Sequence, residues 1–209
     1  MNILVFGATG QTGQQLVKQA LSQGHTVTAF VRNPEALQIG DQRLRVVVGN
    51  TTRDAANVAE AISGQDLVVS ALGSRSSFKS DHLIERSVNT IVPAMERDAV
   101  RRLILISAFG VGESRRDAPL IPRIMYRVLL SDIFADKKAA QDYVRHSSLE
   151  WTFVYPVLLT DGPMTGAYRV GERLELHGLP KISRADVAHF ILAEADKRAF
   201  VRKFAVISY

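Results

Sequence analysis

The sequence predicts an α/β protein whose doubly wound, mostly parallel sheet carries helices on both faces. Short apolar runs alternate with amphipathic segments along the whole chain, which is the pattern of right-handed βαβ units. A glycine-rich turn joins the first apolar run to the first amphipathic segment. Because the 209 residues contain no repeat, low-complexity tract or linker, we expect residues 1–209 to form a single domain.

Local composition places each element in turn. The first segment is a continuous apolar run, as expected for a strand that is buried on both faces. Strands are expected at 3–6, 26–31, 44–48, 66–72, 103–107, 151–155 and 203–207. Helices are expected at 11–23, 52–62, 81–98, 123–130, 135–146 and 183–195. The last helix opens with a capping-box pattern, Ser183 followed three residues later by Asp186. Prolines and glycines predict that residues 160–181 are irregular.

Composition limits the classes of function. A chain without cysteine has no disulfide, thiolate catalysis or cysteine metal ligand. The start of the chain lacks a signal-peptide pattern, and no apolar stretch approaches the roughly 20 residues that span a bilayer. We therefore expect a cytoplasmic protein without membrane contact, and a monomer. The net charge of +5 favours an anionic partner. Nucleic acid is one candidate, although the basic residues form scattered pairs and not a stripe, and a phosphorylated small molecule explains the sign of the charge equally well.

The turn at residues 7–13 has the spacing G-x-x-G-x-x-G, a variant of the dinucleotide-binding loop. Gly7 permits a tight turn, Gly10 lets the backbone approach a pyrophosphate, and Gly13 permits close packing of helix on strand. Glycines also form plain turns, but this triplet between a buried strand and a helix is typical of a Rossmann fold. The loop residues expected to bind an NADP-type cofactor are Gly7, Thr9, Gly10, Gln11, Thr12 and Gly13, the threonines as hydroxyl donors.

Arg32 favours NADPH over NADH. An acidic residue about 20 positions after the loop would bind the ribose hydroxyls of NAD, whereas this chain has Arg32 at the end of the second strand. A guanidinium can bind a 2′-phosphate in bidentate fashion and can stack on adenine. The alternative is a solvated arginine at a strand end.

Other chemistries are not indicated. The chain has no G-x-S-x-G elbow of the α/β-hydrolases, and its five histidines show no metal-ligand spacing. We therefore expect no metal site.

Several motifs together resemble one family. They are FGATGQTG at the N-terminus, VRNPEAL at 31–37, VVVGN at 46–50, SALGSRSSF at 70–78, ISAFG at 106–110, TGAY at 165–168 and SRADVAHFIL at 183–192. This set resembles the atypical short-chain dehydrogenases, in particular the flavin reductase and biliverdin-IXβ reductase group. The resemblance implies further cofactor contacts at Asn50, Thr51, Leu72, Gly73 and Arg75. It also implies a catalytic hydroxyl at Ser107 and a substrate pocket that includes Ser107, Phe109 and Leu158. The alternative for Ser107 is a residue that only caps a strand end.

The proton-transfer motif of ordinary short-chain dehydrogenases, Tyr-x-x-x-Lys, is missing. Lys137 lies at a suitable place, but Ile133 stands four residues before it, where the tyrosine would be. The resembled group also lacks this tyrosine. Hydride transfer to a flavin or a linear tetrapyrrole leaves charge in a large conjugated system, so we expect solvent to supply the proton.

The sequence thus predicts an NADPH-dependent reductase that transfers hydride to a flavin (FMN, FAD or riboflavin), with the flavin as substrate and not as a prosthetic group. A linear tetrapyrrole such as biliverdin is a second candidate acceptor. Biliverdin-IXβ reductases have a histidine where Leu158 stands, so a more apolar pocket favours flavin. The alternative function is a non-catalytic, redox-sensing NADP(H)-binding regulator of the NmrA-like type. Ser107, Arg75 and the irregular segment at 160–181 favour the enzyme.

Overall fold

One eight-stranded sheet organises the molecule, for which a computed structural model describes residues 1–73, 81–116 and 131–209. Its strands lie in the order β3-β2-β1-β4-β5-β6-β10-β8. All neighbours are parallel except β8, which pairs antiparallel with β10 at the edge. Their bounds are β1 Asn2–Phe6, β2 Thr26–Val31, β3 Leu44–Val48, β4 Leu67–Ser70, β5 Arg102–Ile106, β6 Glu150–Pro156, β8 Arg169–Gly171 and β10 Lys203–Ser208. The predicted doubly wound, mostly parallel sheet is confirmed.

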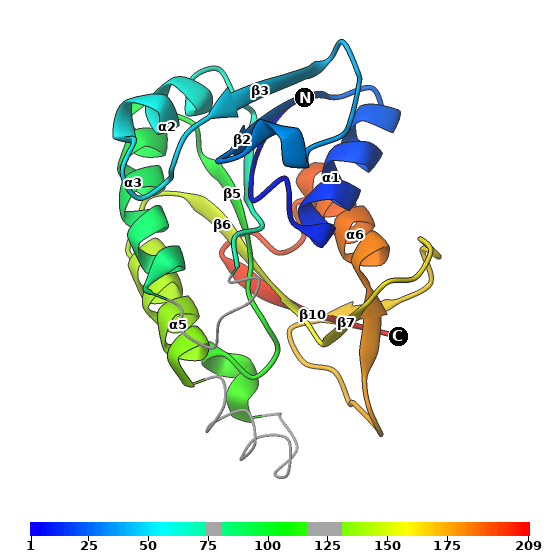
Figure 1. The fold of residues 1–209 in the computed structure, drawn as a ribbon. Helices are drawn as coiled ribbons and strands as arrows, with labels where there is room; N and C mark the ends of the chain where they lie inside the picture. Colours follow the sequence, from blue (N-terminus) through cyan, green and yellow to red (C-terminus); the bar gives the residue numbers. More distant parts are fainter. Residues whose placement is uncertain (74–80, 117–130) are drawn as a thin grey trace.

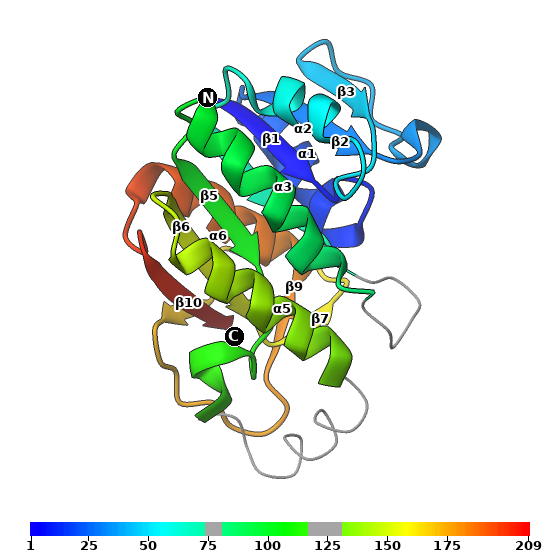
Figure 2. The same ribbon diagram turned by 90° about the vertical axis from the view of Figure 1, so that its left-hand side faces the viewer.

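Helices cover both faces of this sheet, as predicted. Figure 1 shows α1 (Gln11–Ser22) and α6 (Arg184–Lys197) on one face. The other face carries α2 (Ala55–Ile62), α3 (Leu83–Arg97) and α5 (Ser131–Arg145), with α3 and α5 side by side in Figure 2. Two short 3₁₀ helices, η1 (Pro34–Ala36) and η2 (Gly112–Arg116), lie in loops. The helix expected at 123–130 lies outside the described residues.

The core forms two layers, one on each face of the sheet. In β1, Ile3 and Val5 belong to the cluster under α1 and α6, whereas Leu4 and Phe6 belong to the cluster under α2, α3 and α5. All four side chains are fully buried. Alternate side chains of a strand point to opposite faces, so a strand between two helical layers must be apolar at every position.

Some boundaries differ from the prediction. The segment 160–181, expected to be irregular, contributes to three short strands: β7 (Leu158–Thr160) and β9 (Lys181–Ser183), which pair in parallel, and β8. Each has only three residues, too few to show a periodicity, and each is held by a partner distant in the sequence. The strand expected at 66–72 is shorter: β4 spans Leu67–Ser70, and the Ala71 N–H still donates to the Phe6 carbonyl at 2.9 Å.

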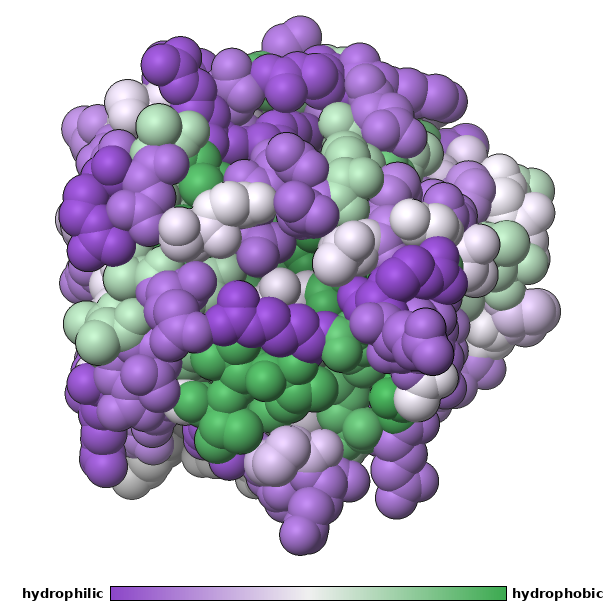
Figure 3. Space-filling model, turned by 90° about the horizontal axis from the view of Figure 1, so that it is seen from above, coloured by the Kyte–Doolittle hydropathy of each residue, from purple (hydrophilic) through white to green (hydrophobic). Residues whose placement is uncertain are grey.

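The surface is mostly polar where Figure 3 shows it. Hydrophilic side chains cover most of the face seen from above, and one apolar area gathers toward its lower edge. In the described part of the chain, no helix combines the length and apolar character that a membrane span requires.

Candidate functional site

The glycine turn lies where the strand order reverses, between β1 and β4. Gly7 follows β1 with a φ of +80°, and an added Cβ there would lie 2.5 Å from the carbonyl oxygen of Ala71. A Cβ on Gly13 would lie 2.2 Å from the carbonyl oxygen of Gly7. Both positions therefore exclude any side chain, as the loop spacing predicts. Ligands of doubly wound sheets bind at such a reversal, beyond the carboxyl ends of the strands.

The N-terminus of α1 opens directly onto this turn. Its N-cap is Gly10, so no side chain caps the helix, and its first turn contains no acidic residue. Among the other loop residues, Thr12 is half-buried, Gln11 is exposed, and the carbonyl oxygen of Thr9 accepts a hydrogen bond from Gln14. Uncapped amides at a helix N-terminus bind anions such as phosphate groups. The loop thus fits the pyrophosphate of a dinucleotide.

Arg32 directly follows β2 at the same edge of the sheet. It is exposed, and no ion pair joins it to another residue in the described ranges. Asn50 and Thr51 follow β3, the strand that neighbours β2 in the sheet. The Asn50 side-chain oxygen accepts hydrogen bonds from Thr52, and the Thr51 hydroxyl lies 2.7 Å from the Ser87 hydroxyl of α3. Thr51 therefore faces inward, and its backbone is the part that remains for a ligand.

Leu72 and Gly73 follow β4 beside the glycine turn. Leu72 is half-buried, whereas Gly73 is exposed and an added Cβ there would meet no atom within 4 Å. Among the described residues, no neighbour of position 73 requires glycine there. Arg75, the remaining residue predicted to bind cofactor, lies outside the described residues.

Ser107 comes directly after β5 and is buried. Its backbone N–H donates to Val154 of β6 at 2.8 Å, and its hydroxyl oxygen accepts a hydrogen bond from Gln141 Nε2 at 2.6 Å. Phe109 follows as a half-buried side chain that packs against both core clusters. Leu158 is exposed on β7. A serine that only caps a strand end would form a hydrogen bond with the backbone nearby. The Ser107 hydroxyl instead accepts its hydrogen bond from the Gln141 side chain of α5.

Lys137 is a buried cation on α5. It lies one helical turn before Gln141, so both residues face the sheet. Burial lowers the pKa of Lys137 to about 8, although the charge of Asp136 acts in the opposite direction. The Asp136 carboxylate itself accepts hydrogen bonds from the N–H groups of Ile84 and Glu85 at the start of α3. An ammonium with this pKa can release or take up a proton close to neutral pH.

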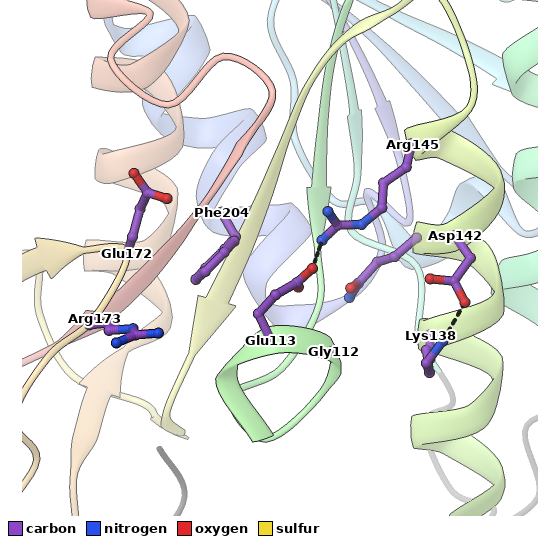
Figure 4. A pocket seen from close by; sticks show the side chains of 9 residues that line it. Gly112, Glu113, Lys138, Asp142, Arg145, Glu172, Arg173 and Phe204 are labelled. Carbon is purple, nitrogen blue, oxygen red and sulfur yellow. Dashed lines mark hydrogen bonds and ion pairs between the residues drawn. The ribbon is translucent and has the colours of Figure 1, made fainter. Parts of the chain in front are cut away.

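Sequence analysis missed the polar partners behind Ser107. The Gln141 side-chain oxygen accepts a hydrogen bond from Tyr155 of β6 at 2.7 Å, and the Tyr155 hydroxyl lies 3.2 Å from Glu113. Glu113 forms an ion pair with Arg145 of α5, drawn as a dashed line in Figure 4. The sequence offered one signal: Gln141 stands four residues after Lys137, on the same predicted helix face.

A pocket of about 710 Å³ lies on the outer side of these partners. Figure 4 shows Lys138 paired with Asp142 on one side, and Glu172, Arg173 and Phe204 on the other. Gln141 also lines this pocket. The polar residues behind Ser107 therefore extend from the carboxyl edge of the sheet to this pocket.

Comparison with known proteins places this geometry in a family. The model of a family described as NAD(P)H-binding matches residues 7–198. An uncharacterised chloroplastic protein of Arabidopsis thaliana is 31% identical over 174 residues, which are 78% of this chain and 61% of the relative. The chain thus spans less than two thirds of that relative.

Solved structures show the same fold. ChuY of Escherichia coli O157:H7, named as an anaerobillin reductase, aligns with a TM-score of 0.82 and 24% identity over 99% of this chain and 96% of its own. A short-chain dehydrogenase/reductase of Veillonella parvula in complex with NADP aligns with a TM-score of 0.80 and 21% identity over 100% and 94%. The family match covers the glycine turn, Ser107 and Lys137, and the predicted NAD(P)H-type cofactor is confirmed. This chain belongs to the NAD(P)H-binding family.

Proposed function

We propose that the protein is an NADPH-dependent reductase that transfers hydride to a flavin, with a linear tetrapyrrole as the second candidate acceptor. The observation that carries this proposal is the arrangement at one edge of the sheet. The uncapped N-terminus of α1, the buried hydroxyl of Ser107 and the buried ammonium of Lys137, which has no ion-pair partner among the described residues, all belong to elements that meet at the carboxyl ends of the strands.

The chain's own residues bind and orient the cofactor in this proposal. Amides of the glycine turn hold the pyrophosphate, and Arg32 binds the 2′-phosphate that distinguishes NADPH from NADH. The bound nicotinamide supplies the hydride, while the protein supplies orientation and electrostatics. Ser107 donates a hydrogen bond to the acceptor or to the nicotinamide.

Lys137 changes one detail of the expectation from sequence, in which solvent alone supplies the proton. A hydride adds an electron pair to the acceptor and leaves it with one more negative charge. A buried ammonium with a pKa of about 8 stabilises that charge and has a proton to transfer. We therefore include Lys137 in the proposed site.

The choice of acceptor rests on the exposed, apolar Leu158 and on the neighbours in fold. Leu158 on β7 offers an apolar contact to a flat ring system. ChuY is named as an anaerobillin reductase, and for this reason we test a linear tetrapyrrole beside the flavins. Monomeric state and cytoplasmic location stay predictions from the sequence.

Steady-state oxidation of NADPH with FMN, FAD, riboflavin and biliverdin tests the proposal. We expect turnover with at least one acceptor, and Ser107→Ala should lower the rate by more than about tenfold. Ser22→Ala is the matched control, because Ser22 is exposed and donates only to Gln19 of its own helix. Tight NADPH binding without turnover of any acceptor would identify the redox-sensing regulator instead.

A further inference from the structure

The partners of Ser107 form a chain of hydrogen bonds that sets the direction of its hydroxyl. Ser107 and Gln141 are both almost fully buried, with 4% and 1% of their surface exposed. The Gln141 side chain bridges Ser107 at 2.6 Å and Tyr155 at 2.7 Å. These contacts join the residue that follows β5 to α5, 34 residues later in the sequence, and to β6, the next element of the chain.

Tyr155 determines which end of the Gln141 amide faces Ser107. The tyrosine hydroxyl has one proton, and its nearest acceptor is the Gln141 oxygen at 2.7 Å, compared with 3.2 Å to Glu113. Burial raises the pKa of Tyr155, and the nearby charge of Glu113 raises it further, so the hydroxyl stays a donor. With its oxygen engaged by Tyr155, the amide presents its NH₂ group to Ser107.

The loop that contains η2 closes over this pair. Gly112 has a φ of +58°, and an added Cβ would lie 2.9 Å from both the Gln141 oxygen and the Tyr155 hydroxyl. The two side chains are therefore confined between the sheet and the loop backbone. Arg145, whose guanidinium lies 5.1 Å from the ring centre of Trp151, holds Glu113 on the outer side.

We infer that Gln141, oriented by Tyr155, is a positioning residue that keeps the Ser107 proton available to the bound acceptor. The Ser107 oxygen accepts from Gln141, and no other hydrogen-bond partner is found for it in the described ranges. The hydroxyl is thereby a donor toward the carboxyl edge of the sheet. This inference rests on the proposed reductase function.

A double-mutant cycle on hydride transfer tests the inference. Single-turnover rates at saturating NADPH should fall by about tenfold in Gln141→Met and by a smaller factor in Tyr155→Phe. In the Ser107→Ala background, Gln141→Met should cost less than about twofold more, because its target is already gone. Tyr143→Phe, on the exposed side of the same helix, is the control and should match wild type. Losses that multiply in the double variant would show that Gln141 acts independently of Ser107.

Gln141→Glu adds a pH readout that a purely structural role would not produce. An ionised carboxylate only accepts, so the Ser107 proton would turn toward it and the rate should fall. A protonated carboxyl group can again donate to Ser107. The rate of this variant should therefore recover as the pH is lowered, whereas wild type should show no such recovery. A pH profile parallel to that of wild type would overturn the inference.

The side-chain amide of Gln141 gives a test that needs no turnover. In ¹H–¹⁵N spectra its NH₂ signals should exchange slowly with water and should shift in both Ser107→Ala and Tyr155→Phe. Signals that are unchanged in Ser107→Ala would overturn the relay. If wild type reduces no acceptor, the reductase proposal fails, and these spectra still decide whether Gln141 holds Ser107.

Discussion

Arg102 and Lys137 are both buried cations, and their surroundings differ at the two edges of the sheet. Arg102 begins β5 at the amino edge. Its guanidinium donates to the Glu150 carbonyl and to Thr152 at 2.8 Å each, and it pairs with Glu194 of α6 at 2.9 Å. Glu194 in turn accepts from the N–H groups of residues 199 and 200. Lys137 lies in the first half of α5, toward the carboxyl edge, and its ammonium has no such partner in the described part of the chain.

The contrast separates structural polar groups from functional ones. A buried charge without a partner lowers stability, so a fold retains it where a ligand or a reaction uses it. Two helix N-termini, both at the carboxyl edge, also differ from each other. Ser183 caps α6 by accepting from the Asp186 N–H at 2.9 Å, whereas α1 begins at Gly10 without a cap. The Arg102 charge at the amino edge is thus paired, although its Nε finds no hydrogen-bond partner in the described residues, whereas the carboxyl edge holds both the capped start of α6 and the uncapped start of α1.

Removing the partner of Arg102 should have the largest effect. Glu194→Ala leaves a buried guanidinium unpaired and frees two backbone N–H groups. We expect the free energy of unfolding to fall by about 3–5 kcal/mol. Urea unfolding at pH 7 measures it, with Glu60→Ala as control, because the exposed Arg45–Glu60 pair should contribute less than about 1 kcal/mol. A loss for Glu194→Ala no larger than for the control would contradict the structural role.

Lys137→Met should raise the free energy of unfolding at neutral pH, whereas Glu194→Ala lowers it. Below about pH 8 the Lys137 side chain is charged in both states, but it is buried in the folded protein and hydrated in the unfolded chain, so its charge disfavours folding. Wild-type stability therefore rises with pH between about 8 and 10.5, as the folded state releases the proton first. At pH 7 we expect Met to stabilise the fold by up to about 3 kcal/mol, the size of the pKa shift, with less advantage at pH 10.

Unfolding curves of the two proteins at pH 7 and pH 10 give this difference. Hydride transfer should slow in the same variant, by more than about tenfold if Lys137 supplies the proton. Lys138→Met is the matched control, because Lys138 is exposed on the next position of the helix. A destabilised Met variant with normal hydride transfer would assign Lys137 to the structure and not to the site.

Local patterns allowed prediction of one part of this site. The glycine turn and the Ser183 cap depend on residues within a few positions of one another, so their spacing predicts them. The contact of Ser107 with Gln141 spans 34 residues and joins two polar side chains inside an apolar layer. Hydrophobic periodicity does not predict contacts between two polar side chains, and for the same reason it did not predict that Lys137 is buried. The three-residue β8 could not be predicted for the same reason, because it is held by pairing with β10, which lies far from it in the sequence.

Arg32→Ala tests the exposed guanidinium that directly follows β2. We expect NADPH binding to weaken by about 2–3 kcal/mol, as for a charge-assisted hydrogen-bonded pair, with NADH binding nearly unchanged. Stability of the free protein should not change, because Arg32 is exposed and makes no ion pair within the described ranges. Calorimetric titration of both cofactors measures the difference. Equal losses for NADPH and NADH would mean that Arg32 does not bind the 2′-phosphate.

Ser183→Ala should have the smallest effect and should separate the two helix ends at the carboxyl edge. The Ser183 hydroxyl oxygen accepts from the Asp186 N–H, and its proton is shared between Asp186 at 3.1 Å and the Pro163 carbonyl at 3.0 Å. Loss of such a cap costs about 1 kcal/mol of unfolding free energy. Because α6 satisfies its own N-terminus, NADPH affinity should stay within about twofold of wild type. Thermal unfolding with and without NADPH measures both quantities. A loss of cofactor affinity without a loss of stability would show that the start of α6, like that of α1, belongs to the binding site.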